Sequence, residues 1–184
     1  MRTGFRVVLS VVFAALISSA SAAQAQNQSW GELAVSAGRL DFDLSGTGNA
    51  RGLAVRATRH LSSHINLEVR GFFADYCGDQ FLGECVPNQL SGSTTLFVPE
   101  AQLQYRWNMG RVSPYIGGGI GAARVKSPLH TEWDTTFSAA VGTAVYLTDR
   151  LGITGELRLR GHETRFTGTT SEITAGLVWR FPAF

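Results

Sequence analysis

The chain has 184 residues, of which 44% are hydrophobic and only 16% are charged. This apolar content excludes a disordered chain, and the charged share lies well below the roughly 25% of ordinary soluble domains. Of the 16 Lys and Arg residues, Arg2 and Arg6 lie near the N-terminus, and the other 14 balance the 14 Asp and Glu. With neither a charge excess nor a basic run, the sequence argues against a nucleic-acid partner.

Residues 1–25 have the features of a cleavable secretory signal peptide. Arg2 and Arg6 supply the positive segment, an apolar stretch runs from Val7 to Ile17, and Ala23 and Ala25 flank a small-residue cleavage site. The apolar stretch has about 11 residues, too few for the roughly 20 of a membrane-spanning helix. The sequence predicts an exported protein with one mature domain, residues 26–184.

Beyond this segment, apolar residues recur at every second position, which predicts β-strands. In chain order the predicted strands are 30–42, 51–60, 65–74, 97–107, 115–125, 133–147, 151–161 and 173–181. Charges keep to one face of each well-defined strand: Glu68 and Arg70, for example, alternate with Leu67 and Val69. The first strand changes phase near Gly38, which we interpret as a β-bulge at that glycine.

The predicted connections fall into two classes. Tight turns lie around residues 62–63, 108–110 and 148–150, whereas the connections 43–50, 76–94, 126–132 and 162–169 are longer. This alternation predicts an all-β, eight-stranded antiparallel up-and-down transmembrane β-barrel, with short turns in the periplasm and long loops outside the cell.

A soluble barrel of the lipocalin type is the alternative, because periodicity alone does not tell which face is inside. Two features favour lipid on the apolar face. Small residues such as Ala140, Gly142 and Ala144 lie on the opposite face, as a narrow lumen requires. Four aromatic residues lie near strand ends on the apolar face, where an interfacial girdle belongs: Tyr105, Trp107, Trp179 and Phe181.

Three segments carry a resemblance to a known family: Pro114–Ala122, Tyr146–Leu151 and the last strand, Ile173–Phe181. With them the chain resembles the small outer-membrane β-barrel family, OmpA- and OmpX-like, of Gram-negative bacteria. The resemblance implies a location in the bacterial outer membrane, in contact with outer-membrane lipid and lipopolysaccharide. It also implies that the barrel-insertion machinery recognises an aromatic residue at the end of the last strand. Phe181 is in phase with that strand, whereas Phe184 is the last residue given but follows the strand-breaking Pro182, so both are candidates.

The polar face of the strands carries six arginines and four glutamates. They are Arg56, Arg70, Arg106, Arg158, Arg160, Arg180, Glu68, Glu100, Glu156 and Glu172. An eight-stranded barrel encloses space only for side chains, and guanidinium groups pair well with carboxylates. We therefore predict a plug of ion pairs in the lumen, with a narrow low-conductance channel as the alternative.

The longest predicted loop, residues 76–94, contains Cys77 and Cys85, and the exported context favours a disulfide between them. A cysteine-based metal site would need further His or Cys ligands nearby. Tyr76, Phe81 and Leu82, with Phe97 nearby, give this loop an apolar surface for a possible ligand.

No cofactor is predicted. The segment from Asp41 resembles the start of a calcium loop, but Gly52 stands at the twelfth position, where a glutamate is needed. A lipid A-modifying enzyme is the alternative function, with His162, Glu163 and Ser171 as candidate groups that could meet across one hairpin. We expect a structural or surface-interaction protein rather than an enzyme.

Overall fold

The structure, a computed structural model, describes residues 30–42, 50–76, 80–81, 84–85, 94–126, 131–162 and 169–181. The longer strands are β1 (Gly31–Phe42), β2 (Ala50–His60), β3 (Ile65–Tyr76), β6 (Thr94–Arg106), β7 (Val112–Lys126), β8 (Thr131–Tyr146), β9 (Leu151–His162) and β10 (Thr169–Phe181). Two short strands, β4 (Gln80–Phe81) and β5 (Glu84–Cys85), pair with each other apart from them.

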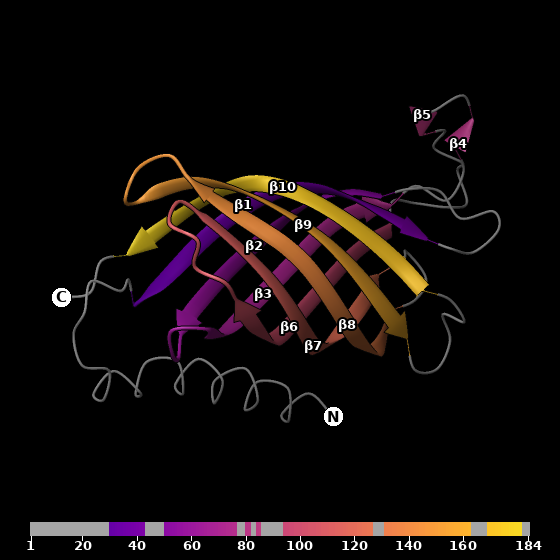
Figure 1. The fold of residues 1–184 in the computed structure, drawn as a ribbon. Coiled ribbons are helices and arrows are strands. Elements are labelled where there is room, and N and C mark those ends of the chain that lie inside the picture. Colours follow the sequence, from indigo (N-terminus) through magenta and orange to yellow (C-terminus); the bar gives the residue numbers. More distant parts are fainter. Residues whose placement is uncertain are drawn as a thin grey trace.

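Within the described residues, the eight longer strands close a barrel in the order β1-β10-β9-β8-β7-β6-β3-β2 (Figure 1). Every neighbouring pair is antiparallel, and β1 closes the ring against β10 from Gly31↔Phe181 to Phe42↔Thr170. The predicted up-and-down barrel is confirmed. None of the described residues forms a helix that is long and apolar enough to cross a membrane.

Three tight connections lie at the end of the barrel where β1 begins and β10 ends, called here the short-turn end. They join β2 to β3, β6 to β7 and β8 to β9. Gly110 has a φ of +67°, a left-handed conformation that favours glycine in the turn between β6 and β7. Thr148 accepts hydrogen bonds through its hydroxyl from the amides of Arg150 and Leu151. The opposite end, where the longer connections leave the barrel, is the long-loop end.

The outer wall is apolar and the interior is polar over most of the barrel height. Leu103 on β6 and Ile173 on β10 are 56% and 60% exposed on the outer wall. Glu68, Arg70 and Arg158, by contrast, are buried inside. A soluble barrel would show the reverse arrangement, so the apolar wall is the surface that meets lipid.

The predicted bulge at Gly38 is wrong. Pairing of β1 with β2 continues without a break from Gly31↔Arg59 to Leu40↔Ala50, so the side chains keep their alternation. Arg39 points outward, and Leu40, which is 2% exposed, points inward. The phase change in the sequence reflects a change in polarity near the long-loop end, where the interior becomes apolar and the outer wall becomes charged.

The glycines of β7 make room for large polar side chains in the lumen. A Cβ atom on Gly119 would lie 2.6 Å from the Cβ atom of Gln102, and one on Gly121 would lie 2.5 Å from the Cγ atom of Glu100. Both glycines face β6 across the ladder, at Gln102↔Gly119 and Glu100↔Gly121. The glycine-rich segment therefore gives β6 side chains the space to extend across the interior.

Candidate functional site in the barrel interior

Four arginines and four glutamates meet in the middle of the lumen, and we call them the central cluster. They are Arg56, Arg70, Arg158, Arg160, Glu68, Glu100, Glu156 and Glu172, all buried. They come from β2, β3, β6, β9 and β10. Their formal charges cancel, which is the condition under which ionised groups are tolerated in a site shielded from water.

Arg158 is the hub of the central cluster. Its guanidinium lies 2.9 Å from Glu156 Oε1, 3.3 Å from Glu68 Oε1 and 3.4 Å from Glu100 Oε2. It also donates a hydrogen bond to the Ser138 hydroxyl on β8, at 3.2 Å. In the ring of eight strands, β9 lies opposite β3, so the contact of Arg158 with Glu68 joins the two walls across the full width of the lumen.

Two further groups of contacts complete the central cluster. Arg160 lies 2.6 Å from Glu100 Oε2 and 2.7 Å from Glu172 Oε2, and Arg70 pairs with the same two carboxylates. On the other side, Arg56 Nη1 donates to Glu156 Oε2 at 2.9 Å and to the hydroxyl of Tyr115 at 2.6 Å. Each carboxylate therefore has at least one charged partner on a strand that is not its neighbour in the ring.

A second, smaller cluster closes the lumen at the short-turn end, and Glu32 is its centre. Arg106 Nη1 donates to Glu32 Oε2 at 2.6 Å, and Arg180 lies 3.4 Å from Oε1. The hydroxyl of Tyr146 also donates to Glu32. The guanidinium of Arg180 lies 3.6 Å above the ring of Tyr146, a cation–π contact. Arg180 is the least buried of these side chains.

Near the long-loop end the interior changes character and forms a surface that we call the apolar cup. Its buried members are Leu40, Ala50, Ala54, Phe72, Ala74, Leu96, Val98 and Ala123, with Val125 packed against them. The lumen thus contains three layers: an ionic cluster at the short-turn end, the central cluster, and the apolar cup.

Of the ten charged residues that the sequence singles out for the lumen, eight form the central cluster and two, Arg106 and Arg180, join the cluster around Glu32. The structure adds some residues that sequence reasoning missed. Glu32 shares its face with Ala34 and Ser36, so its alternation with Leu33 and Val35 was a signal that could have found it. The hydroxyls of Tyr115 and Tyr146 gave no such signal, because an aromatic residue on a strand is equally compatible with either face.

The predicted girdle residues gather at the short-turn end. Tyr105 and Trp179 are exposed on the outer wall, and Trp107 follows β6 with its ring 4.9 Å from that of Tyr105, edge to face. Phe181 stacks on Trp30 at 5.5 Å where the two ends of the barrel sheet meet. Phe184 lies outside the described residues.

The side chains of Cys77 and Cys85 also lie outside the described part of the structure, although the backbone of Cys85 belongs to β5. Phe97, which the sequence places at the start of the strand 97–107 and near the loop, lies on the outer wall, where it stacks on Phe73 at 4.5 Å. The strand β6 begins at Thr94, three residues before the predicted start.

Two of the candidate groups of the alternative enzyme function, His162 and Ser171, do not come together. His162 points into the lumen, where its Nε2 atom lies 3.4 Å from the Thr170 hydroxyl. Ser171 pairs with Leu159 across the β9–β10 ladder, so it shares the outward face of that residue. His162 and Ser171 therefore lie on opposite faces of the sheet and do not meet, and Glu163 lies outside the described residues. Among the residues the structure describes, no group of three or more His, Cys, Asp or Glu could hold a metal ion.

A family model of the outer membrane protein beta-barrel domain matches residues 10–181. The chain belongs to this outer-membrane β-barrel family. The membership confirms the family resemblance and the bacterial outer membrane as the location, and the apolar wall described above is accordingly its lipid-facing surface. No curated protein sequence matches the chain.

Solved structures of outer-membrane barrels share its fold at low sequence identity. Neisserial surface protein A is 15% identical, with a TM-score of 0.59 over 82% of this chain and 96% of that one. OprG from Pseudomonas aeruginosa is 12% identical, with a TM-score of 0.57 over 87% and 100%. Ail of Yersinia pestis, in complex with the heparin analogue sucrose octasulfate, is 13% identical, with a TM-score of 0.56 over 85% and 100%. At these identities the likeness concerns the fold alone.

Proposed function

We propose that this outer-membrane barrel is a closed structural scaffold that presents its long connections at the cell surface for interaction, and that it neither conducts ions freely nor modifies lipid A. The observation that carries the proposal is the Glu68–Arg158 contact between opposite walls, within a neutral cluster of eight paired charges. An ion would have to separate these pairs to pass, and breaking a buried pair is costly.

Conductance and lipid chemistry test the two halves of this proposal. In planar bilayers, the folded protein should give no discrete conductance steps. Lipid A from cells that express it should show an unchanged acyl pattern in mass spectrometry. Regular open-channel steps from the unaltered protein, or a changed acyl pattern that depends on it, would show that the scaffold reading is wrong.

The loop 76–94 is the proposed contact region. Ail of Yersinia pestis, a barrel of the same fold, has been solved in complex with the heparin analogue sucrose octasulfate, which supports a search for a ligand of this barrel. Deleting residues 78–84 should leave barrel folding intact, because the segment lies outside the eight barrel strands. The same deletion should abolish any adhesion to host or cell-wall material that the intact protein confers, and a misassembled deletion variant would contradict this division of labour.

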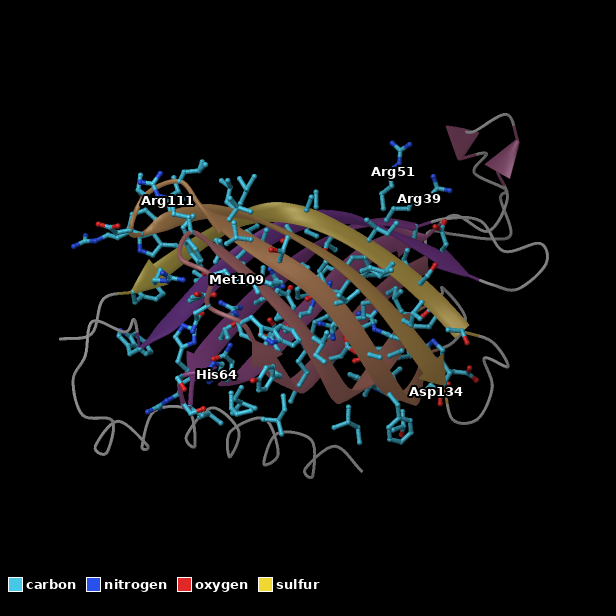
Figure 2. All side chains as sticks on the ribbon, viewed as in Figure 1. Arg39, Arg51, His64, Met109, Arg111 and Asp134 are labelled. Atoms are coloured by element: carbon cyan, nitrogen blue, oxygen red, sulfur yellow. The ribbon has the colours of Figure 1, made fainter. Side chains whose placement is uncertain are left out.

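The outer leaflet is the proposed lipid partner. At the long-loop end the outer wall carries Arg39, Arg51, Arg124 and Lys126, just beyond the apolar belt. Figure 2 shows Arg39 and Arg51 at this end, with Arg111 and His64 at the other. Arg39 and Arg51 are cross-strand partners, and Arg39 also pairs with Asp41 at 2.9 Å. Like charges directly opposite each other repel, and an anionic group bound between the two guanidinium groups would relieve that repulsion.

Phosphate groups of lipopolysaccharide have the chemistry that this pair would recognise. Replacing both Arg39 and Arg51 with Gln should weaken binding to lipopolysaccharide-containing vesicles by about thirtyfold, at about 1 kcal/mol for each charge near an anionic surface. The same change at Arg111 and Arg150, exposed at the short-turn end, is the matched control and should have no effect on this binding. Equal losses of binding for both double variants would contradict a specific role of Arg39 and Arg51.

A further inference from the structure

The three tight turns at the short-turn end share an unusual composition. Each turn carries one exposed large apolar side chain: Leu61, Met109 and Leu147. In two of the turns an exposed arginine follows, Arg111 after Met109 and Arg150 after Leu147. Figure 2 shows Met109 and Arg111 at this end. An apolar side chain close to a cationic one suits the membrane–water interface, where acyl chains and charged headgroups are both within reach.

The aromatic girdle fixes the level of these turns relative to the membrane. Tyr105 and Trp179 are exposed on the outer wall at the short-turn end. Side chains of tyrosine and tryptophan collect at the level of the lipid headgroups. Trp179 is the cross-strand partner of Leu151, which directly follows Arg150 in the sequence. Arg150 therefore lies at the level of the headgroups, in the periplasmic leaflet if the short turns face the periplasm.

The short-turn end also has an excess of positive charge. Among the described residues, five arginines and two carboxylates lie at this end: Arg59, Arg106, Arg111, Arg150, Arg180, Glu32 and Asp149. The excess is three positive charges with the histidines neutral. Glu32 is already held by two of the arginines inside the lumen. Asp149 is then the one carboxylate of this group that is exposed, against the exposed Arg111 and Arg150.

Backbone hydrogen bonds hold Arg111 and Arg150 in place. The amide of Tyr146 donates to the carbonyl oxygen of Arg111 at 2.8 Å, and the amide of Arg180 donates to that of Arg150 at 2.7 Å. The Thr148 hydroxyl accepts from the amide of Arg150 at 3.3 Å. The two arginines are thus anchored through their main chains, and their guanidinium groups are available to a ligand at the membrane surface.

We propose that the short-turn end selects anionic phospholipids in the periplasmic leaflet, with lipid phosphates on Arg111 and Arg150 and acyl chains against Met109 and Leu147. The planar guanidinium group matches two phosphate oxygens at once. A zwitterionic lipid brings an ammonium group together with its phosphate, and the excess positive charge of this end disfavours that group. Lipopolysaccharide belongs to the opposite leaflet, so this inference does not rest on the proposed role of Arg39 and Arg51.

Quenching of tryptophan fluorescence by brominated lipids measures this selectivity. The folded protein is placed in phosphatidylcholine vesicles that contain increasing fractions of dibrominated phosphatidylglycerol, with dibrominated phosphatidylcholine as the reference. Trp179 alone reports on the short-turn end when Trp30, Trp107 and Trp133 are replaced with phenylalanine. A second protein that keeps only Trp133, exposed near the start of β8, reports on the long-loop end. Phosphatidylglycerol should be preferred over phosphatidylcholine at Trp179.

Two substitutions in one turn give opposite expectations. One charge near an anionic surface contributes about 1 kcal/mol, a factor of about five in affinity. Arg150→Gln should therefore lower the preference for phosphatidylglycerol at Trp179 about fivefold, and Asp149→Asn should raise it by a similar factor. Both side chains are exposed, and asparagine suits a turn as well as aspartate does. Neither substitution should change the quenching of Trp133, and heat-modifiable gel mobility shows that both variants are folded.

Three results would overturn the proposal. The first is an equal affinity of the two lipids at Trp179 in the protein with the native turn. The second is a change in the same direction, or no change, for Arg150→Gln and Asp149→Asn, which would show that the charge of the turn does not select the lipid. The third is an equal change at Trp133, which would indicate an effect of net charge on the whole barrel.

Discussion

Replacing Arg158 with methionine is expected to lower the free energy of unfolding by about 3–5 kcal/mol. The Arg158 side chain is 0% exposed and lies within 3.4 Å of three carboxylates, those of Glu68, Glu100 and Glu156. Methionine keeps an unbranched stem in the same place, so the change removes the charge and the hydrogen bonds more than it removes packing.

The magnitude follows from the charge balance of the central cluster. With Arg158 gone, three arginines face four glutamates, and one buried carboxylate is left without a counter-charge. Removing one partner of a buried ion pair typically lowers the free energy of unfolding by about 3–5 kcal/mol, which is the magnitude expected here. Replacing Glu68 with Gln in the Arg158→Met protein makes the central cluster neutral again. Gln104 and Thr58 donate hydrogen bonds to the Glu68 carboxylate, and the amide oxygen of glutamine can accept the same bonds. The two substitutions should therefore be coupled by about 0.5–3 kcal/mol, in the direction of rescue.

Urea unfolding of the barrel in lipid vesicles, followed by tryptophan fluorescence, measures these differences. Arg39→Met is the matched control, because Arg39 is 58% exposed and its ion pair with Asp41 lies on the surface. The Arg39→Met change should lower the free energy of unfolding by less than about 1 kcal/mol. If Arg158→Met were as mild as Arg39→Met, or if Glu68→Gln made the Arg158→Met protein less stable still, the reasoning from a neutral, fully paired plug would be refuted.

Three further predictions concern parts of the chain at its ends and in its longest loop. Replacing Phe181 and Phe184 together with alanine should abolish outer-membrane assembly, and unchanged heat-modifiable mobility of the double variant on gels would refute this. Cys77 and Cys85 are predicted to form a disulfide, so their alkylation should require prior reduction, and free thiols in the exported protein would refute the pairing. Removal of this disulfide should lower the free energy of unfolding by about 2–3 kcal/mol, because the unfolded chain regains the entropy of an open loop. Sequencing of the mature N-terminus should begin near Gln26, whereas a retained N-terminus would contradict the signal peptide.

The strands and their faces could be read from the sequence because a strand places successive side chains on opposite sides by its local geometry alone. Leu67, Glu68, Val69 and Arg70 illustrate this: their alternation predicts the outward and inward faces that the structure has. The tight turns were equally readable, since each lies between two alternating segments. Around Gly38 the alternation predicts a bulge that the structure does not have. There the inner face of β1 becomes apolar and its outer face becomes charged, so a regular strand has the sequence pattern of a bulged one.

The sequence by itself thus determined the eight strands, the membrane-facing surface and most of the charged residues of the lumen. Only the tertiary structure decided that Arg158 meets Glu68 across the barrel, that Tyr115 and Tyr146 join the ionic clusters, and that His162 and Ser171 are kept apart. These contacts depend on closure of the ring and on the stagger between strands, which are properties of all eight strands together. The apolar cup belongs to the same category, because its residues come from five strands and share no local pattern.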